Sequence, residues 1–503
     1  MPVETSIKIA DFADKLPATV LLSLSTAKQV TDIDNIKIIL IVTHKNFFIH
    51  IPPKKVYEWD KLVYEKIKKY VILCLGDYMK VFFHTLGCKV NQYETQEMRE
   101  QLNINGYEVT DDESDADIFV VNSCTVTSES DRKTRQCVRH YKKKYPHSTV
   151  VLTGCMPQSF PEMAEKLTEA DIVLGNKNNK LLVKALNEYF SAGCRTLYME
   201  QHQSGEPLVS SGISNFEERT RAILKIEDGC DRFCSYCIIP KARGRVRWKP
   251  IEDIKNEVKA LTDNGYSEIV LVGINLSAYG KGSELTLADA VYAVSENEKV
   301  QRIRLGSLEP DHITDEMIER LAKCNKLCPQ FHISLQSGCD KILKKMNRHY
   351  TSDEYFSLCQ KLRSEFKDCT LTTDIMVGFP YENDEDFEIT KQFAYKVGFE
   401  KIHIFPYSRR SGTVADRMDE QNEKSTKAQR VSELSVVANN IRNKFLEGQI
   451  GKTLSVLVEE KQKDNVYFGY TANYTPVKLN DGIVGEIRQV KIVSVQDDFC
   501  IGE

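Results

Sequence analysis

The chain has 503 residues, of which 41% are hydrophobic and 28% charged, and its formal net charge is −4. This is the composition of an ordinary globular protein, long enough for two to four domains of roughly 150 residues each. It excludes a uniformly basic surface, and no run approaches the ~20 apolar residues of a membrane helix. The 15 cysteines are too sparse for a disulfide scaffold. Their clustering points to metal chemistry in a reducing compartment, which we take to be the cytoplasm.

Residues 1–78 carry no visible chemistry. Their apolar run at 36–42 is too short and too far inside the chain for a signal peptide, and a helix is predicted at 57–71. A strand then begins at Met79 and leads directly into a cysteine motif. Either the first segment is a real appendage of unknown role, or Met79 is the working initiator and the upstream residues are an over-long start. The change of pattern favours the second interpretation.

From Met79 onward, strands alternate with helical segments such as 93–102, a pattern typical of a parallel α/β sheet. We expect this domain to span 79–192. Its predicted strands are 81–86, 117–121, 149–152 and 170–174.

Three cysteines, Cys88, Cys124 and Cys155, each follow one of these strands. Because ligands collect at the carboxyl ends of parallel strands, we expect the three thiols to meet at one edge and bind a metal cluster. The alternative for each is a buried structural cysteine.

A basic run with no acidic interruption lies between the second and third of these cysteines. It includes Arg132, Lys133 and Arg135 and continues to Lys144. Such a run is usually a solvated helix face, but its position beside the proposed cluster edge predicts contacts with a nucleic-acid backbone.

Residues 193–218 are polar and irregular and are predicted to be a linker. Six strand-like runs follow, each with a helical segment behind it, as in the helix at 251–261 with its single apolar face. Six βα units predict a partial (β/α)6 barrel over 219–440, whose active site lies at the carboxyl ends of the strands. The strand-like runs are 223–226, 269–272, 303–305, 331–335, 371–377 and 401–405.

The loop after the first barrel strand carries Cys230, Cys234 and Cys237 in the spacing C-x3-C-x2-C. Three thiolates from one loop can hold three irons of a 4Fe–4S cluster and leave the fourth iron open to a small molecule. A zinc site or chance clustering is the alternative, although zinc sites more often pair two C-x2-C units.

The tail, 441–503, is predicted to be a small all-β barrel that follows an amphipathic helix. Tyr470 and Tyr474 are candidates for stacking on single-stranded nucleic acid. Packing in the core of the barrel is the alternative for each ring.

With both cysteine triads in place, residues 79–503 resemble the radical S-adenosylmethionine (SAM) methylthiotransferases, including their carboxyl-terminal RNA-binding TRAM domain. Trp248, where we expect a small polar residue, and residues 1–78 depart from the family pattern. KVNQYE (89–94) and GYTANY (469–474) are most similar to the subgroup acting on N6-threonylcarbamoyladenosine in tRNA. The other matching motifs are LGC (86–88), NSCTVT (122–127), TGCMPQ (153–158), CSYCIIP (234–240), RGR (243–245), SLQSG (334–338), DIMVGFP (374–380) and FPYS (405–408).

The resemblance implies two 4Fe–4S clusters. One, on the loop cysteines, reduces SAM to methionine and a 5′-deoxyadenosyl radical that takes hydrogen from C2 of the modified adenine. The other, on Cys88, Cys124 and Cys155, carries the methylated sulfur. It further implies that Tyr236 contacts the adenine of SAM. Gly273, Ser307 and Gln336 are weaker candidates for lining that site. The implied partners are tRNA, SAM, a flavodoxin- or ferredoxin-like electron donor and a sulfur source.

Two alternatives to this function stay open. The enzyme class could be the same with a different substrate, either isopentenyladenosine in tRNA or an aspartate of a ribosomal protein. The chain could instead be an iron–sulfur redox or RNA-binding protein without turnover, although such a carrier has no need of a substrate-sized barrel. The cysteines that follow the loop in the barrel are predicted to be small buried hydrophobes, namely Cys324, Cys328, Cys339, Cys359 and Cys369.

Overall fold

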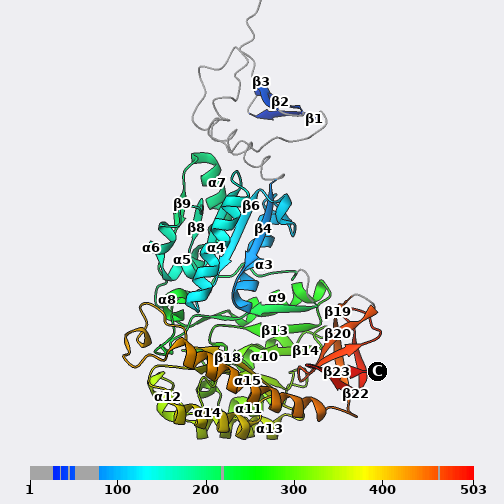
Figure 1. Ribbon diagram of the computed structural model, residues 1–503. Helices are drawn as coiled ribbons and strands as arrows, with labels where there is room; N and C mark the ends of the chain where they lie inside the picture. The colour runs from blue at the N-terminus through cyan, green and yellow to red at the C-terminus, as the bar shows by residue number, and fades with distance from the viewer. Residues whose placement is uncertain (1–26, 34–35, 44–45, 51–78, 217–219, 463–464) are drawn as a thin grey trace, which may run out of the picture. The chain divides into compact units, whose positions relative to one another are not determined.

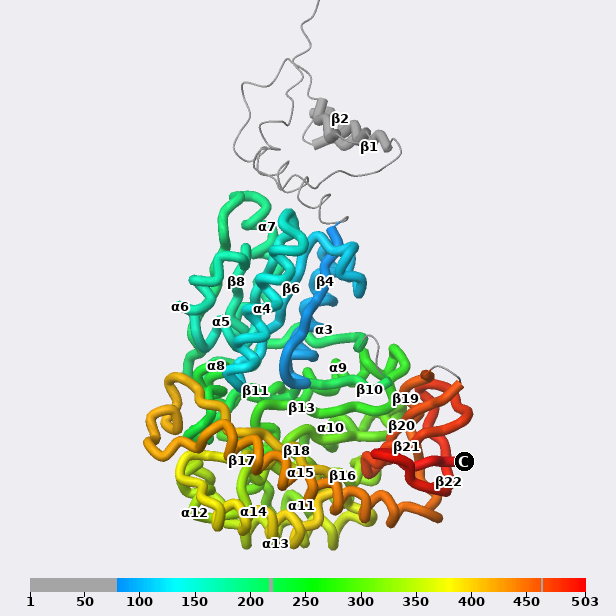
Figure 2. Tube along the Cα trace, viewed as in Figure 1, coloured from blue at the N-terminus to red at the C-terminus, as the bar shows by residue number. Residues whose placement is uncertain are grey.

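The computed structural model describes residues 27–33, 36–43, 46–50, 79–216, 220–462 and 465–503 (Figure 1, Figure 2). Its contacts divide the chain into two compact units. The first comprises Met1–Leu86, Met98–Cys124 and Ser130–Glu200, and the second comprises Gly87–Glu97, Thr125–Glu129 and Gln201–Glu503.

The described part of the first 78 residues is an antiparallel sheet of three strands in the order β1-β2-β3. The helix predicted at 57–71 lies outside the described residues. The strands are β1 (Ala27–Ile33), β2 (Ile36–Thr43) and β3 (Asn46–His50).

The rest of the first unit is built on a six-stranded parallel sheet in the order β5-β4-β6-β7-β8-β9. The sheet confirms the predicted parallel α/β class. It also contains two short strands that the sequence did not indicate, β5 and β9, and β9 lies within the segment expected to be a linker. The strands are β4 (Lys80–Thr85), β5 (Glu108–Thr110), β6 (Ile118–Ser123), β7 (Thr149–Gly154), β8 (Ile172–Leu174) and β9 (Thr196–Tyr198).

Helices bury apolar side chains on both faces of this sheet. On one face, Met98 and Leu102 of α3 (Lys89–Ile104) join α7 (Leu182–Ala192) in a core with the strands. On the other face, α4 (Ser128–Lys144) inserts Val138 and packs with α5 (Cys155–Ser159) and α6 (Pro161–Glu165). The central strands β6 and β7 are therefore buried on both faces, as their continuous apolar runs require.

The second unit contains two parallel sheets, β10-β13-β14 and β15-β16-β17-β18, and an isolated bridge pairs Ile303 of β14 with Leu327, three residues before β16. They confirm the predicted partial βα barrel, with the short extra strand β15 between the third and fourth long strands. The strands are β10 (Arg221–Lys225), β13 (Glu268–Val272), β14 (Arg302–Leu305), β15 (Ser307–Leu308), β16 (Gln330–Ile333), β17 (Thr370–Val377) and β18 (Lys401–Pro406).

The barrel helices share one large apolar core with these strands. In the first of them, the predicted face of Ile254, Val258 and Leu261 is buried. The helices are α9 (Ile251–Asp263), α10 (Leu287–Ser295), α11 (Asp315–Ala322), α12 (Asp340–Lys345), α13 (Ser352–Glu365), α14 (Asp384–Val397) and α15 (Lys424–Glu447).

The tail forms the predicted small barrel, closed in the order β19-β20-β21-β23-β22 around a core that includes Val456, Val477 and Ile492. From its sequence pattern alone, the segment 466–477 is predicted to be one strand, but a turn with positive φ at Tyr474 divides it. No helix in the described ranges is long and apolar enough to cross a membrane. The strands are β19 (Thr453–Lys461), β20 (Tyr467–Thr471), β21 (Pro476–Leu479), β22 (Ile487–Gln496) and β23 (Phe499–Gly502).

Candidate active site at the cysteine loop of the barrel

The cysteine loop begins where β11 (Glu227–Asp228) pairs with β12 (Arg247–Trp248) and ends at α8 (Ile239–Arg243). Its first residue must be glycine. Gly229 has φ +88°, and a Cβ there would lie 2.0 Å from the carbonyl oxygen of Arg245. The backbone can take this sharp turn only without a side chain.

Backbone contacts fix the rest of the loop. The N–H of Cys230 donates to the carbonyl of Gly244 (3.0 Å), and the N–H of Ser235 donates to that of Met346 (2.9 Å). The hydroxyl of Ser235 donates to the carbonyl of Lys345 (2.8 Å). The loop is thus anchored to two different segments of the barrel.

The three loop thiols influence one another electrostatically, and each is partly exposed. Burial raises the pKa of Cys230 above its ordinary value, and burial followed by the charge of Cys234 raises the pKa of Cys237 to about 12. Thiols in this setting keep their protons until a metal displaces them. The guanidinium Nη1 of Arg348 lies 3.3 Å from the sulfur of Cys234 and supplies positive charge beside it.

The three thiols of the loop are the donor set of a cluster. A four-iron cluster needs its thiolates spread over separate corners, which three cysteines along an anchored loop can provide. The donor set therefore fits an iron–sulfur cluster.

Two polar side chains beside the loop, Asn275 and Glu227, carry unsatisfied atoms. Both side-chain polar atoms of Asn275 and Oε1 of Glu227 are buried without a hydrogen-bond partner among the residues that the structure describes. The other oxygen of Glu227 accepts from the N–H of Asn275 (2.7 Å) and is so close to Gly273 that a Cβ there would lie 2.5 Å away. Unsatisfied buried polar atoms at the ends of β10 and β13 are what a polar ligand such as SAM would satisfy.

Of the predicted SAM contacts, Tyr236 is partly buried, with its ring edge-on to Phe379 at a centroid distance of 6.3 Å. Ser307 is exposed at the start of β15. Gln336 follows β16 in the left-handed conformation, φ +69°, and its N–H donates to the carbonyl of Asp374 (2.8 Å). Gly273, Ser307 and Gln336 follow the carboxyl ends of barrel strands, and Tyr236 lies in the cysteine loop. Direct contact of these residues with SAM stays a prediction.

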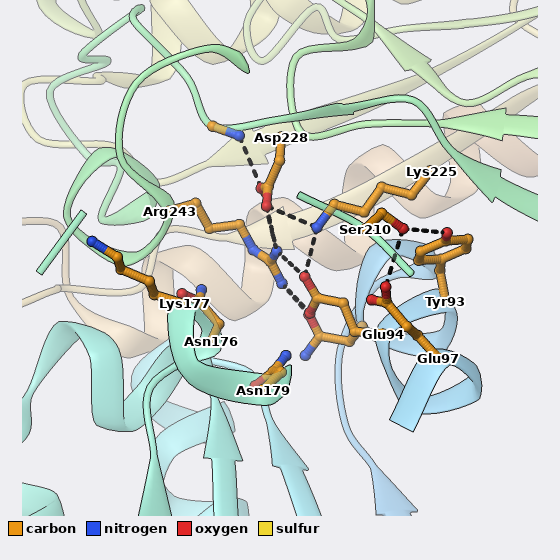
Figure 3. Close-up of polar contacts among 12 residues, drawn as sticks. Tyr93, Glu94, Glu97, Asn176, Lys177, Asn179, Ser210, Lys225, Asp228 and Arg243 are labelled. Carbon is orange, nitrogen blue, oxygen red and sulfur yellow. Dashed lines mark hydrogen bonds and ion pairs between the residues drawn. The ribbon is translucent and has the colours of Figure 1, made fainter. Parts of the chain in front are cut away.

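A buried cluster of charges underlies the loop, and Figure 3 shows it. The guanidinium of Arg243, 1% exposed, contacts the carboxylates of Glu94 and Asp228. Nζ of Lys225 donates to the same two carboxylates, at 2.8 Å each. Burial opposes the charge on Asp228, but Lys225 and Arg243 outweigh it and lower the pKa of Asp228 well below its ordinary range. Glu94 and Arg243 lie in the motifs KVNQYE and RGR, but the sequence did not indicate that they meet in one cluster.

The amino-terminal cysteines follow the strands as predicted. Cys124 and Cys155 come directly after β6 and β7, whose last residues, Ser123 and Gly154, are in register. Cys88 follows β4 by three residues, and by its contacts it belongs to the second unit. There its thiol lies 3.7 Å from Oδ1 of Asn91. Binding of a cluster by this triad stays a prediction.

The predicted basic run forms α4. Acidic side chains from elsewhere in the first unit pair with its second half, for example Glu169 with Arg139 and Asp171 with Lys142. Arg132 and Lys133 in the first half are exposed, whereas Arg135 is partly buried and its Nη1 lies 3.1 Å from Sδ of Met163. Arg132 and Lys133 are therefore the exposed basic residues in the first half of α4.

The two tail tyrosines stack on each other, with ring centroids 4.5 Å apart. The guanidinium of Arg221 lies over both rings, and that of Arg304 lies over Tyr474. Both rings thus contact barrel arginines, and stacking of RNA on them stays a prediction. The five barrel cysteines predicted to be small buried hydrophobes are buried or, for Cys369, partly buried.

The sequence is similar to known families over both units. Residues 224–394 match the radical SAM superfamily, and residues 80–175 match the uncharacterized protein family UPF0004. The fold is similar to that of TsrM, a radical SAM methyltransferase from Kitasatospora setae, with a TM-score of 0.50 and 13% identity over 67% of this chain and 73% of that one. The barrel and its cysteine loop are thus those of a radical SAM protein.

Full-length relatives define the family more closely. Threonylcarbamoyladenosine tRNA methylthiotransferase MtaB of Thermotoga maritima is 37% identical over 84% of this chain and 96% of its own length. The MtaB of Bacillus subtilis is 35% identical over 84% of this chain and 96% of its own length. A tRNA-2-methylthio-N(6)-dimethylallyladenosine synthase of Clostridium botulinum is 34% identical over 84% of this chain and 95% of its own length. The chain belongs to the radical SAM methylthiotransferase family.

Proposed function

We propose that the protein adds a methylthio group to C2 of N6-threonylcarbamoyladenosine next to the anticodon of tRNA. The observation that supports this substrate is the similarity to the MtaB enzymes over 96% of their length. Relatives named for dimethylallyladenosine make that nucleoside the second candidate. None of the relatives described above is named for transfer to a ribosomal-protein aspartate or for a redox role without turnover.

In this function the loop cysteines hold the 4Fe–4S cluster, and Arg348 compensates negative charge at the sulfur of Cys234. When bound, the cluster and SAM supply the electron and the 5′-deoxyadenosyl radical that removes hydrogen from C2. Asn275 and Glu227 provide polar atoms for SAM at the strand ends. We propose that Cys88, Cys124 and Cys155 hold a second cluster, which the strand-end positions of all three support.

The proposed partners are tRNA, SAM, a flavodoxin- or ferredoxin-like electron donor and a sulfur source. The exposed Arg132 and Lys133 at the start of α4 are proposed to contact the tRNA backbone. We place the reaction in the cytoplasm, because tRNA is its substrate.

The test is an anaerobic reaction of the full chain with SAM, reductant, sulfide and tRNA carrying either modified adenosine, followed by mass spectrometry of the nucleosides. We expect the methylthio product from threonylcarbamoyladenosine. Cys234→Ala abolishes it, whereas Cys359→Ala, at a buried cysteine of α13, retains it. Product only from the dimethylallyl nucleoside would overturn the proposed substrate.

A further inference from the structure

The last barrel strand, β18, exposes one of its two faces. Ile402 and Ile404 pack against the core that contains Leu434 and Val437 of α15. The alternate residues Lys401, His403 and Phe405 are exposed on the opposite face. Because helices cover the outside of a βα barrel, this opposite face is its interior. β18 is also the edge strand of its sheet.

Neighbouring strands continue this interior face with polar side chains. In register, Lys401 lies beside Thr372, and His403 lies beside Asp374. On the next strand, His332 is in register with Thr372, and its Nδ1 lies 2.9 Å from the threonine hydroxyl. Nε2 of His332 lies 3.3 Å from Oδ2 of Asp374, and the rings of His332 and His403 are 5.7 Å apart. We call Lys401, His403, His332 and Asp374 the polar barrel face.

Lys401 carries positive charge at the exposed end of this face. Partial burial lowers the pKa of His403, Asp374 opposes this effect, and the neighbouring His332, Lys401 and Lys89 lower the pKa further. His403 is therefore neutral near pH 7 and offers both a donor and an acceptor nitrogen. Asp374 is already in contact with His332, whereas Lys401 is exposed towards the interior. An anion is the complementary ligand for this end of the face.

The geometry points to the polar barrel face as the subsite for the group on N6 of the substrate adenosine, with Lys401 and His403 binding a carboxylate on that group. The inference rests on the proposed function and deepens it. A threonylcarbamoyl group carries a carboxylate, a hydroxyl and a urea, which can satisfy a lysine, histidines and a carboxyl group. A dimethylallyl group has no polar atom, so it would remove water from the lysine and the histidine without offering them a hydrogen-bond partner. A site built for hydrogen bonds rejects such an analogue strongly.

The test measures binding to the anaerobically reconstituted full chain without SAM, so that no turnover contributes. The probes are fluorescently labelled anticodon stem-loops of one sequence that carry threonylcarbamoyladenosine, its methyl ester, dimethylallyladenosine or adenosine. Anisotropy gives the four dissociation constants. We expect the threonylcarbamoyl RNA to bind about tenfold tighter than the adenosine RNA, as one charged hydrogen-bonded pair would provide. The methyl ester removes the charge and should lose most of that preference.

Lys401→Met and His403→Leu should each reduce the threonylcarbamoyl-to-adenosine ratio towards one. The matched control is Lys323→Met, at an exposed lysine at the end of α11. If the variants keep the wild-type ratio, or if the ester binds as tightly as the acid, the inference is overturned but the proposed substrate is not. Wild-type preference for the dimethylallyl RNA would overturn the proposed substrate as well. The ester probe decides the question with wild-type protein even if a variant fails to fold.

Discussion

Nη2 of Arg243 donates a 2.8 Å hydrogen bond to Oδ1 of Asn91, and the same amide oxygen lies 3.7 Å from the sulfur of Cys88. The guanidinium also contacts Asp228, whose Oδ1 accepts from the N–H of Gly229 at 2.9 Å. Gly229 precedes the first loop cysteine. A continuous path within the second unit therefore connects one thiol of the amino-terminal triad to the loop that holds the other triad.

Arg243→Met should destabilise the second unit strongly. It leaves Glu94 and Asp228 buried, with Lys225 between them and Arg247 beside Asp228 as the remaining cations. Breaking one partner of a buried pair costs about 3–5 kcal/mol. Arg245→Met, at a side chain that is 55% exposed, should change stability by less than about 1 kcal/mol. Urea unfolding of both variants checks this. Equal midpoints would show that the cluster contributes no net stability.

Gly229→Ala should prevent the loop from forming, because its Cβ meets the carbonyl of Arg245. Gly265 is a matched control, since it also has positive φ (+95°) but no atom of the described residues within 4 Å of the position that a Cβ would take. Gly265→Ala should lower the free energy of unfolding only by the strain of the left-handed conformation, about 1–2 kcal/mol. Iron content after reconstitution is the measurement. Retention of the loop cluster in Gly229→Ala would contradict the close packing described here.

Arg348→Met should make the loop cluster harder to reduce, because a positive charge beside the sulfur of Cys234 stabilises the added electron. The expected change is a lower potential, on the order of tens of millivolts. Arg348→Lys keeps the charge and should stay closer to wild type. Redox titration followed by electron paramagnetic resonance measures both. An unchanged potential in Arg348→Met would mean that Arg348 only shapes the loop.

Glu227→Gln should stabilise the apo-protein at neutral pH. Burial raises the pKa of Glu227 well above its ordinary value, so the folded state binds a proton that the unfolded state releases above about pH 4.5. Wild type therefore loses stability as the pH rises from that value towards the folded-state pKa, and the amide does not. The difference in unfolding free energy should grow over this window. A constant difference would show that Glu227 has an ordinary pKa.

The fold followed from local patterns. Continuous apolar runs predicted β6 and β7, and the spacing of Ile254, Val258 and Leu261 predicted α9. The short strands β5, β9 and β23 were not predicted, because three or four residues carry too little periodicity and depend on neighbouring strands for pairing. The turn at Tyr474, which divides the tail segment 466–477 into two short strands, was missed for the same reason.

The site was predictable where its chemistry lies close together in sequence, as in the cysteine loop. Arg348 follows Cys234 by 114 residues, and Arg243 follows Asn91 by 152. Asn275 and Glu227 become notable only once burial shows that their polar atoms lack partners within the described part of the chain. Such residues are recognised from contacts between distant segments, which one sequence does not display.

The presence of two clusters is tested most directly by the iron content of the anaerobically reconstituted chain, in wild type and after replacement of the three loop cysteines by alanine. One four-iron cluster on each triad predicts about eight irons per chain, falling to about four in the variant. About four irons falling to none would contradict this, because Cys88, Cys124 and Cys155 would then hold no cluster to supply the sulfur.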